Sequence, residues 1–286
     1  MSNIGLVLEG GALRGLYTCG VLDFFMEKNI WLSYSIGVSA GACNGVSYVS
    51  RQKERSRRIN VDYVNDKRYL SFRNLLREKS VFGIDFAYNQ LPNILDPFDY
   101  NKFFDCEENF TIVATDCVTG KPVYFNKDHF KGNKEDILTA IRASSSMPFL
   151  APIVHYDGLA LLDGGIADPI PIRKAIADGN KKNIVVLTRN KGYRKEPFKL
   201  GWAASKLYAK YPGIVKAMKE RYMLYNDTLE YIEELEKENK VLVLTPSKPI
   251  EVGRLEKDKD KLIALYKNGY RDAEEKYKQI IEFLQK

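Results

Sequence analysis

A serine lies between two glycines where an apolar stretch meets a run of small residues. The segment Gly37-Val38-Ser39-Ala40-Gly41 follows an apolar strand predicted over residues 34–38, and a closely packed helix is predicted from Ala40 onwards. A sharp strand-to-helix turn holds its central residue in strained backbone angles, so the residues two positions away must be small. The helix then directs its amide dipoles at the serine. The pattern predicts a nucleophile elbow at Ser39, although a tight turn with an incidental serine would look the same.

An aspartate in a comparable setting is the candidate base. Asp163 follows the apolar residues 159–162 and precedes Gly164 and Gly165, which allow another segment to approach closely. The ordinary pKa of an aspartate is about 3.9, so as a base it needs burial or a hydrogen bond that strengthens during attack. We therefore predict that Asp163 lies in a dry cleft beside Ser39. The alternative is an Asp-Gly β-turn with no chemical role.

Histidine, the usual partner of a nucleophilic serine, is scarce in this chain. Only His129 and His155 are present. In the common arrangement the histidine comes late in the fold, whereas at least two predicted strands follow His155. A Ser-His-Asp triad is therefore poorly supported, and His155 is expected to be an ordinary polar residue on a strand or hairpin.

A glycine-rich loop, Glu9-Gly10-Gly11-Ala12-Leu13-Arg14-Gly15, separates the first predicted strand, over residues 4–8, from the first predicted helix. Such a loop presents unpaired backbone N–H groups, which bind a phosphate or the oxyanion of a tetrahedral intermediate. Dinucleotide binding is the weaker alternative. Ala12 occupies the place of the middle glycine in that motif, and Asp23 follows Gly15 too closely to be its ribose-binding acid.

The elements around these motifs predict an α/β fold with a mostly parallel sheet, because two strand-turn-helix units follow one another. An amphipathic helix is predicted over residues 134–144, and one long C-terminal helix over residues 258–284, broken near Gly269. Residues 61–104 show no clear pattern. Further strands are predicted over residues 110–114, 123–125, 159–162, 184–188 and 241–245.

Composition places the chain among folded globular proteins, because 45% of its residues are hydrophobic and 28% are charged. We expect a cytoplasmic protein without metal or organic cofactor. The N-terminal residues lack a basic stretch before an apolar one, and no run of 18 apolar residues occurs. The cysteines are too far apart for a C-x-x-C pair and are expected to be reduced thiols; they are Cys19, Cys43, Cys106 and Cys117.

The net charge of +7 is concentrated in one segment. Residues 189–221 hold ten Lys or Arg residues against Glu196 and Glu220, and aromatic residues such as Trp202 are interleaved with them. This pattern predicts an amphipathic cap that contacts an anionic membrane surface, with a solvated lysine-rich helix pair as the alternative. Nucleic acid is not an expected partner, because no nucleic-acid-binding module accompanies the charge.

The three motifs, in this order, resemble the patatin-like phospholipase family, in particular its bacterial serine acyl hydrolases. The family pattern is a glycine-rich loop with an arginine, then G-x-S-x-G, then D-G-A or D-G-G. The resemblance covers roughly residues 5–270, and its combined spacing is specific where each motif alone is not. Further similar segments are residues 6–15, 114–116, 119–124, 140–148, 247–249 and 254–257.

The resemblance implies a serine acyl hydrolase with a Ser39–Asp163 dyad and no catalytic histidine. Gly10, Gly11 and Ala12 match the family's oxyanion loop. Ala12 replaces a frequent third glycine, so the loop is expected to adopt a conformation that alanine tolerates and to narrow the site. Arg14 matches a basic family position and is expected to hold the loop through backbone carbonyls, or else to meet a lipid phosphate.

The resemblance also implies a three-layer fold, with a patatin-like core over residues 1–188. Residues 189–286 would add the basic cap, one further strand and a C-terminal helical extension packed on the core. The implied substrate is a lipid or other ester, cleaved by a phospholipase A, lysophospholipase or related lipid esterase. A thioesterase, a transacylase or a non-catalytic lipid-binding protein are the alternatives, and the oligomeric state stays open.

Overall fold

The computed structural model describes residues 4–285 and contains one mixed sheet of eight strands. The strand order is β5-β6-β3-β2-β1-β7-β8, and β4 pairs with β3 beside this path. Strands β1, β2, β3, β7 and β8 run parallel, whereas β4 and β6 are antiparallel to β3. The bounds are β1 Ile4–Leu8, β2 Tyr34–Val38, β3 Asn109–Asp116, β4 Pro122–Asn126, β5 Val154–Tyr156, β6 Leu159–Asp163, β7 Lys182–Val186 and β8 Val241–Leu244.

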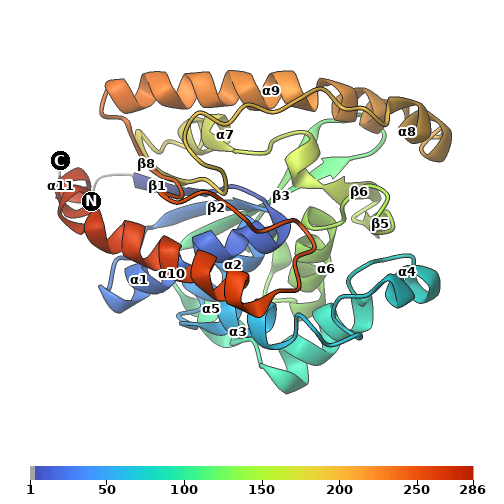
Figure 1. Cartoon of the computed structure of the whole chain (residues 1–286), viewed down its shortest axis with the longest axis horizontal. Coiled ribbons are helices and arrows are strands. Elements are labelled where there is room, and N and C mark those ends of the chain that lie inside the picture. The colour runs from blue at the N-terminus through green and yellow to red at the C-terminus, as the bar shows by residue number, and fades with distance from the viewer. Residues whose placement is uncertain (1–3, 286) are drawn as a thin grey trace.

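Helices cover both faces of the sheet and make the molecule three-layered, which confirms the predicted fold class (Figure 1). One face carries α7 Ile172–Ala177 and α9 Pro212–Lys237, and the other carries α1 Leu16–Glu27, α2 Ala40–Val49 and α10 Lys259–Glu275. The remaining helical elements are η1 Ala12–Gly15, α3 Arg55–Asp62, α4 Phe72–Glu78, the π-helix η2 Phe86–Leu95, α5 Tyr100–Asp105, η3 Lys127–Phe130, α6 Lys134–Ser144, η4 Gly164–Ile166, α8 Gly201–Leu207 and α11 Tyr277–Gln285.

Alternate side chains of the central strands enter two separate cores. In β1, Leu6 and Leu8 pack with α1 and α2, whereas Val7 packs with α7 and α9. All three side chains are fully buried. A strand covered on both faces must be apolar along its whole length, and this is why the sequence shows short continuous apolar runs instead of alternation.

The C-terminal helix is interrupted at Lys276, between α10 and α11, and the predicted break near Gly269 is wrong. Gly269 instead lies where α10 crosses α1: a Cβ atom there would come within 2.0 Å of the Tyr17 carbonyl oxygen. Gly20 on α1 has the reciprocal role, because its Cβ would lie 2.0 Å from the Tyr266 carbonyl oxygen. Both glycines therefore serve close helix packing.

The other predicted elements agree with the structure to within a few residues. Strand β7 begins and ends two residues earlier than predicted, so that Leu187 and Thr188 continue towards the glycine-rich loop. Strand β5 contains His155 and pairs with β6, as the prediction of a strand or hairpin at His155 requires, and residues 61–104, which showed no clear pattern, contain α4, η2 and α5. No helix within residues 4–285 is long and apolar enough to cross a membrane.

Candidate active site

Ser39 lies at the turn between β2 and α2 with strained backbone angles of φ 54° and ψ −122°. Neither Gly37 nor Gly41 has room for a side chain. A Cβ on Gly37 would lie 2.7 Å from the Gly41 carbonyl carbon, and a Cβ on Gly41 would lie 2.4 Å from the Leu8 carbonyl oxygen. The turn has the geometry of a nucleophile elbow, in which a sharp change of direction exposes the serine hydroxyl.

Asp163 ends β6 and accepts a hydrogen bond of 2.7 Å from the Ser39 hydroxyl at its Oδ2 atom. The Gly165 amide donates to the other carboxylate oxygen over 2.8 Å. Ser39 and Asp163 are only 6% and 7% exposed. Burial raises the pKa of Asp163 above its ordinary value, although the Ser39 hydrogen bond and the charge of Arg221 oppose the shift. A carboxylate in this environment is a stronger base than one in water.

The polar neighbours of Ser39 and Asp163 hold them at this separation. The buried Ser144 hydroxyl accepts a hydrogen bond of 2.8 Å from the Ser39 amide, and the Asp163 amide donates to the Ser146 carbonyl oxygen over 2.8 Å. The Thr115 hydroxyl donates to the Asp163 carbonyl oxygen. Ser144 was not predicted as a site residue, although it lies in the family-like segment 140–148.

The glycine-rich loop lies directly against the serine. A Cβ on Gly10 would approach the Ser39 Cβ to 3.0 Å, and a Cβ on Gly11 would approach the Thr188 hydroxyl to 2.7 Å. Within residues 4–285, the amides of Gly10, Gly11 and Ala12 have no protein acceptor. Three unpaired donors beside a buried serine are suited to holding an oxyanion.

Ala12 has a φ of 50°, in the left-handed region. Ala12 therefore has a φ angle typical of glycine, and the expectation that the loop adopts a conformation that alanine tolerates is wrong. This conformation costs an L-residue about 1–2 kcal/mol. Ala12 lines both cavities that meet at Ser39, and its methyl group thus occupies part of the site.

Arg14, near the end of the loop, has 9% of its surface exposed, and its Nε atom has no hydrogen-bond partner within the described chain. Among residues 4–285, its side chain does not form the expected bonds to backbone carbonyls. Burial, followed by the charges of Arg189 and Arg254, lowers the pKa of Arg14 to about 10. Arg14 lines the larger cavity beside Ser39.

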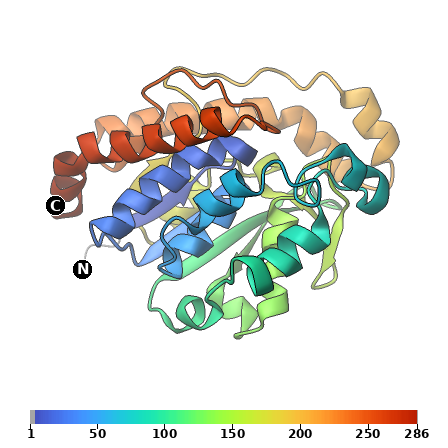
Figure 2. The ribbon, with the colours of Figure 1, turned by 60° about the horizontal axis from the view of Figure 1, so that its bottom comes forward.

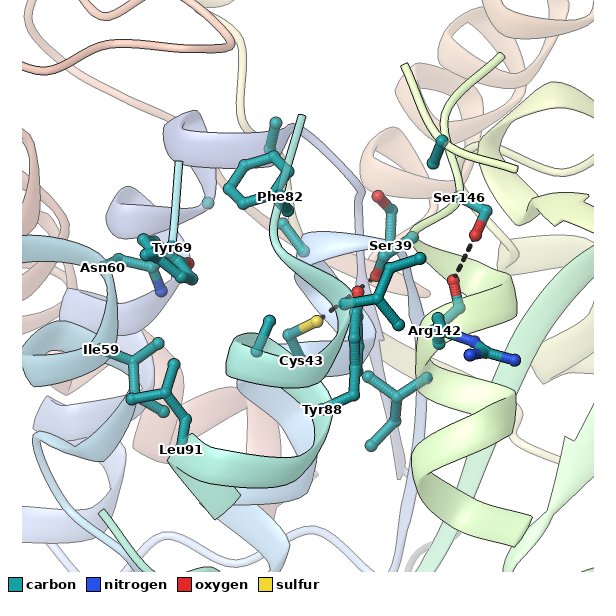
Figure 3. A pocket seen from close by; sticks show the side chains of 18 of the residues that line it. Ser39, Cys43, Ile59, Asn60, Tyr69, Phe82, Tyr88, Leu91, Arg142 and Ser146 are labelled. Atoms are coloured by element: carbon teal, nitrogen blue, oxygen red, sulfur yellow. Dashed lines mark hydrogen bonds between the residues drawn. The ribbon is translucent and has the colours of Figure 1, made fainter. Parts of the chain in front are cut away.

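Two cavities meet at Ser39. The first has a volume of about 160 Å³ and is mainly apolar. Figure 3 shows Ser39, Cys43 and Tyr88 close together, with Ile59 and Leu91 across the cavity. The second has a volume of about 550 Å³ and is lined by Asp163, the glycine-rich loop and several basic side chains. Ser39 can therefore contact an apolar group on one side and a charged group on the other.

Neither histidine reaches this site. His155 is exposed on β5, and His129 packs against Phe125 and Tyr156. Neither lines a cavity that contains Ser39. Residues 4–285 also contain no group of three His, Cys, Asp or Glu side chains that could hold a metal ion.

Five basic residues of the larger cavity were not predicted as site residues: Arg189, Lys195, Lys199, Arg221 and Arg254. The first four belong to the basic segment 189–221, in which the sequence does not distinguish inward from outward side chains. Arg254 lies in the family-like segment 254–257, and that resemblance was the available signal. Its carbonyl oxygen accepts a hydrogen bond from the Leu13 amide, which joins this segment to the glycine-rich loop.

Similarity to known proteins covers most of the chain. The uncharacterized protein YjjU of Escherichia coli is 28% identical over 257 residues, which are 86% of this chain and 69% of that protein. A probable lipid hydrolase of Invertebrate iridescent virus 6 is 27% identical over 62% of this chain and 65% of its own length. An uncharacterized NTE family protein of Mycobacterium tuberculosis is 28% identical over 59% of this chain, and the match spans 44% of that protein.

The structure of VipD from Legionella pneumophila has the same fold, with a TM-score of 0.50 and 13% identity, over 96% of this chain and 66% of that one. The model of a domain of unknown function (DUF6363) matches residues 211–285. The model described as patatin-like phospholipase matches residues 6–176, which is more than half of the chain. The protein therefore belongs to the patatin-like phospholipase family.

Proposed function

We propose that the protein is a serine acyl hydrolase that cleaves lipid esters as a phospholipase A, a lysophospholipase or a related lipid esterase. The observation that carries this proposal is the hydrogen bond of 2.7 Å from Ser39 to a buried Asp163 at a strained strand-to-helix turn. Membership of the family and the similarity to a probable lipid hydrolase support lipid esters as substrates.

In the proposed reaction, Asp163 accepts the hydroxyl proton as Ser39 Oγ attacks the ester carbonyl. The tetrahedral oxyanion is held by the amides of residues 10–12. The intermediate collapses with loss of the alcohol, which takes the proton from Asp163, and the acyl group remains on Ser39. Water attacks this acyl-enzyme and gives its proton to Asp163. The carboxylic acid then leaves, and the proton returns to Ser39.

The apolar cavity supports an acyl chain as the group that stays on the serine. Its lining includes Val46, Ile59 and Leu91, and burial of each methylene in such a cavity contributes about 0.8 kcal/mol. A thioesterase or a transacylase with the same dyad is the second candidate, because both form the same acyl-enzyme. Comparing hydrolysis of an oxygen ester and a thioester with the same acyl chain distinguishes an esterase from a thioesterase, and acyl transfer to an added alcohol in preference to water would identify a transacylase.

A fluorophosphonate probe tests the nucleophile directly. We expect the wild-type protein to gain one probe mass, and the Ser39→Ala protein to gain none, in intact mass spectra. Ser205→Ala is a matched control, because Ser205 is exposed on α8 and bonds to the Gly201 carbonyl oxygen. An adduct that persists in folded Ser39→Ala would refute the assignment.

We also propose that the end of the molecule carrying α4 and α8 docks on an anionic membrane. Both helices lie at the same end in two views (Figures 1 and 2). Trp202 on α8 is 74% exposed, and Leu76 on α4 is 88% exposed. Exposed lysines accompany them at positions 199, 206 and 210. Apolar side chains flanked by lysines suit the interface of an anionic bilayer.

Vesicle sedimentation tests this docking surface. We expect the Trp202→Ser, Leu76→Ser double variant to bind phosphatidylglycerol vesicles at least tenfold more weakly than wild type. Met223→Ser is the control, since Met223 is an exposed apolar residue on α9, outside both helices. Equal binding by the double variant and the wild type would contradict the proposal.

A further inference from the structure

One side of α9 lines the larger cavity beside Ser39. Figure 1 shows this helix lying along the sheet, on the face that also carries α7. It belongs to residues 211–285, which match a domain of unknown function and lie outside the patatin-like match. Four of its side chains line the cavity, at the i, i+3, i+4 and i+7 spacing of a single helix face; they are Met218, Arg221, Tyr222 and Tyr225. A segment outside the patatin-like match therefore forms one wall of the candidate active site.

Arg221 contacts the turn that carries the proposed base. Its Nε atom donates a hydrogen bond to the carbonyl oxygen of Gly165, two residues after Asp163. A Cβ on Gly165 would lie 3.0 Å from the Oδ1 atom of Asp163 and 3.2 Å from the Nη2 atom of Arg221. The absence of a side chain at Gly165 therefore allows the guanidinium and the carboxylate to approach each other across the turn.

Arg221 and Asp163 stabilise each other's charged form. Burial raises the pKa of Asp163, and the charge of Arg221 opposes this shift. Burial likewise lowers the pKa of Arg221, and the charge of Asp163 opposes that shift. Within residues 4–285, Arg221 has no carboxylate oxygen within 4.0 Å, so its charge is not taken up by an ion pair elsewhere. A buried carboxylate without a nearby cation would favour its neutral form.

Other ionisable groups surround Asp163. Arg254, in the segment after β8, acts on Asp163 in the same direction as Arg221 but more weakly. Burial raises the pKa of Cys43 on α2 and of Tyr88 on η2, so both stay neutral in acid. Lys195 lines the same cavity, and burial lowers its pKa to about 7, so it is charged at lower pH. The remaining charged residues of the larger cavity are Glu9, Arg14, Arg189, Glu196 and Lys199, and those of the apolar cavity are Arg55 and Arg142.

Tyr225, one turn further along α9, is linked to the glycine-rich loop. Its hydroxyl donates a hydrogen bond of 2.7 Å to the buried Glu9 carboxylate. The other carboxylate oxygen of Glu9 accepts a hydrogen bond of 2.5 Å from the Thr188 amide. The Thr188 hydroxyl lies 3.0 Å from the Gly10 carbonyl oxygen. Polar contacts therefore connect Tyr225 to the loop whose amides are the proposed oxyanion donors.

We propose that the C-terminal segment completes the active site through α9: Arg221 keeps the carboxylate of Asp163 ionised, and Tyr225 holds the glycine-rich loop in place. Both are positioning residues, because they act through groups that the proposed reaction uses. This inference rests on the proposed hydrolase function and gives a task to a segment that the patatin-like match leaves out.

Arg221→Gln tests the effect on the base, because it removes the charge that faces Asp163. Proton transfer from Ser39 requires an ionised carboxylate, so the acid limb of the plot of kcat/KM against pH should move to higher pH. With a soluble nitrophenyl ester, the loss relative to wild type should be about tenfold greater on this limb than on the plateau, the effect of one opposite charge nearby. Arg221→Lys, which keeps the charge, should return the limb most of the way. A residue needed only for packing would give a loss that does not depend on pH.

Lys219→Gln is the matched control. It removes one charge from the same helix, but Lys219 is exposed and lines neither cavity at Ser39, so its pH profile should coincide with that of wild type. An acid limb at the wild-type position in folded Arg221→Gln would overturn the role of Arg221. If that variant does not fold, Arg254→Gln decides, because Arg254 is exposed and its loss should move the limb in the same direction by a smaller amount. An unshifted limb there would equally overturn the electrostatic role.

Tyr225→Phe tests the effect on the loop. Removal of an oxyanion donor costs about 10²–10³-fold in kcat, so loss of a contact that only positions the donors should lower kcat by about tenfold, with little change in KM. Tyr231→Phe is the control, because Tyr231 lies on the same helix and lines neither cavity at Ser39. A wild-type kcat in Tyr225→Phe would show that this hydroxyl does not support the loop.

The rate of fluorophosphonate labelling separates failure of this inference from failure of the proposed hydrolase. Labelling requires an activated Ser39 but no ester substrate. If wild type labels yet cleaves no ester, the hydrolase proposal fails, and the pH dependence of labelling in Arg221→Gln still tests Arg221. If wild type cleaves esters and the acid limb is the same in Arg221→Gln, only the present inference fails. If wild type neither labels nor cleaves esters, both fail.

Discussion

Asp163→Asn should lower kcat for a short-chain nitrophenyl ester by about 10²–10⁴-fold, the usual contribution of a general base. The amide has almost the same shape as the carboxylate, and it can still accept the Gly165 amide hydrogen bond and contact Ser39. It cannot take the serine proton. The loss should therefore appear in kcat, with little change in KM.

The pH dependence of the wild-type reaction should report the same carboxylate. Because burial raises the pKa of Asp163 above its ordinary value, kcat/KM should fall with decreasing pH at a point above that value. The raised pKa also makes the free energy of unfolding depend on pH. The stabilising contribution of Asp163 is fully present when the pH is below the ordinary pKa of the carboxyl group, and it is lost as the pH rises through the raised pKa. Asp163→Asn should therefore be at least as stable as wild type at pH 7.

His155→Ala is the control for this experiment, because His155 is exposed on β5 and lines neither cavity at Ser39. It should keep wild-type activity. If His155→Ala abolished ester hydrolysis in a folded protein while Asp163→Asn did not, the serine would depend on a histidine and the dyad would be wrong.

Gly269→Ala should destabilise the protein by about 3 kcal/mol or more, the upper end of the effects of overpacking. The added methyl would lie 2.0 Å from the Tyr17 carbonyl oxygen, and this atom belongs to the backbone of α1 and cannot rotate away. The gain in helix propensity, about 1 kcal/mol, is smaller. The melting temperature should fall by roughly 6–12 °C for a loss of that size.

Gly253→Ala is the matched control. A Cβ at Gly253 would meet no atom within 4 Å, so thermal and urea unfolding should match wild type within about 0.5 kcal/mol. Gly20→Ala should resemble Gly269→Ala, since its methyl would meet the Tyr266 carbonyl oxygen from the other helix. Wild-type stability in both helix variants would show that α1 and α10 can separate without cost.

The sequence by itself determined the elements that carry the site. Strands buried on both faces require continuous apolar runs, and the elbow at Ser39 requires glycine two residues away on each side, so both features are visible in local residue order. The pairing of Ser39 with Asp163 was also predictable, because the resemblance to the family links two motifs that are 124 residues apart.

Contacts between distant segments were decided only by the tertiary structure. A glycine in a helix looks like a break when only propensity is considered, yet Gly269 is needed because α1 passes within contact distance of its Cα. The basic segment 189–221 was predicted to be an amphipathic cap, or else a solvated lysine-rich helix pair. In the fold its side chains divide: Arg189, Lys195 and Arg221 line the larger cavity together with Arg14, whereas Lys206 and Lys210 remain exposed. Charge can be counted from sequence, but the direction of each charged side chain depends on the elements that pack beside it.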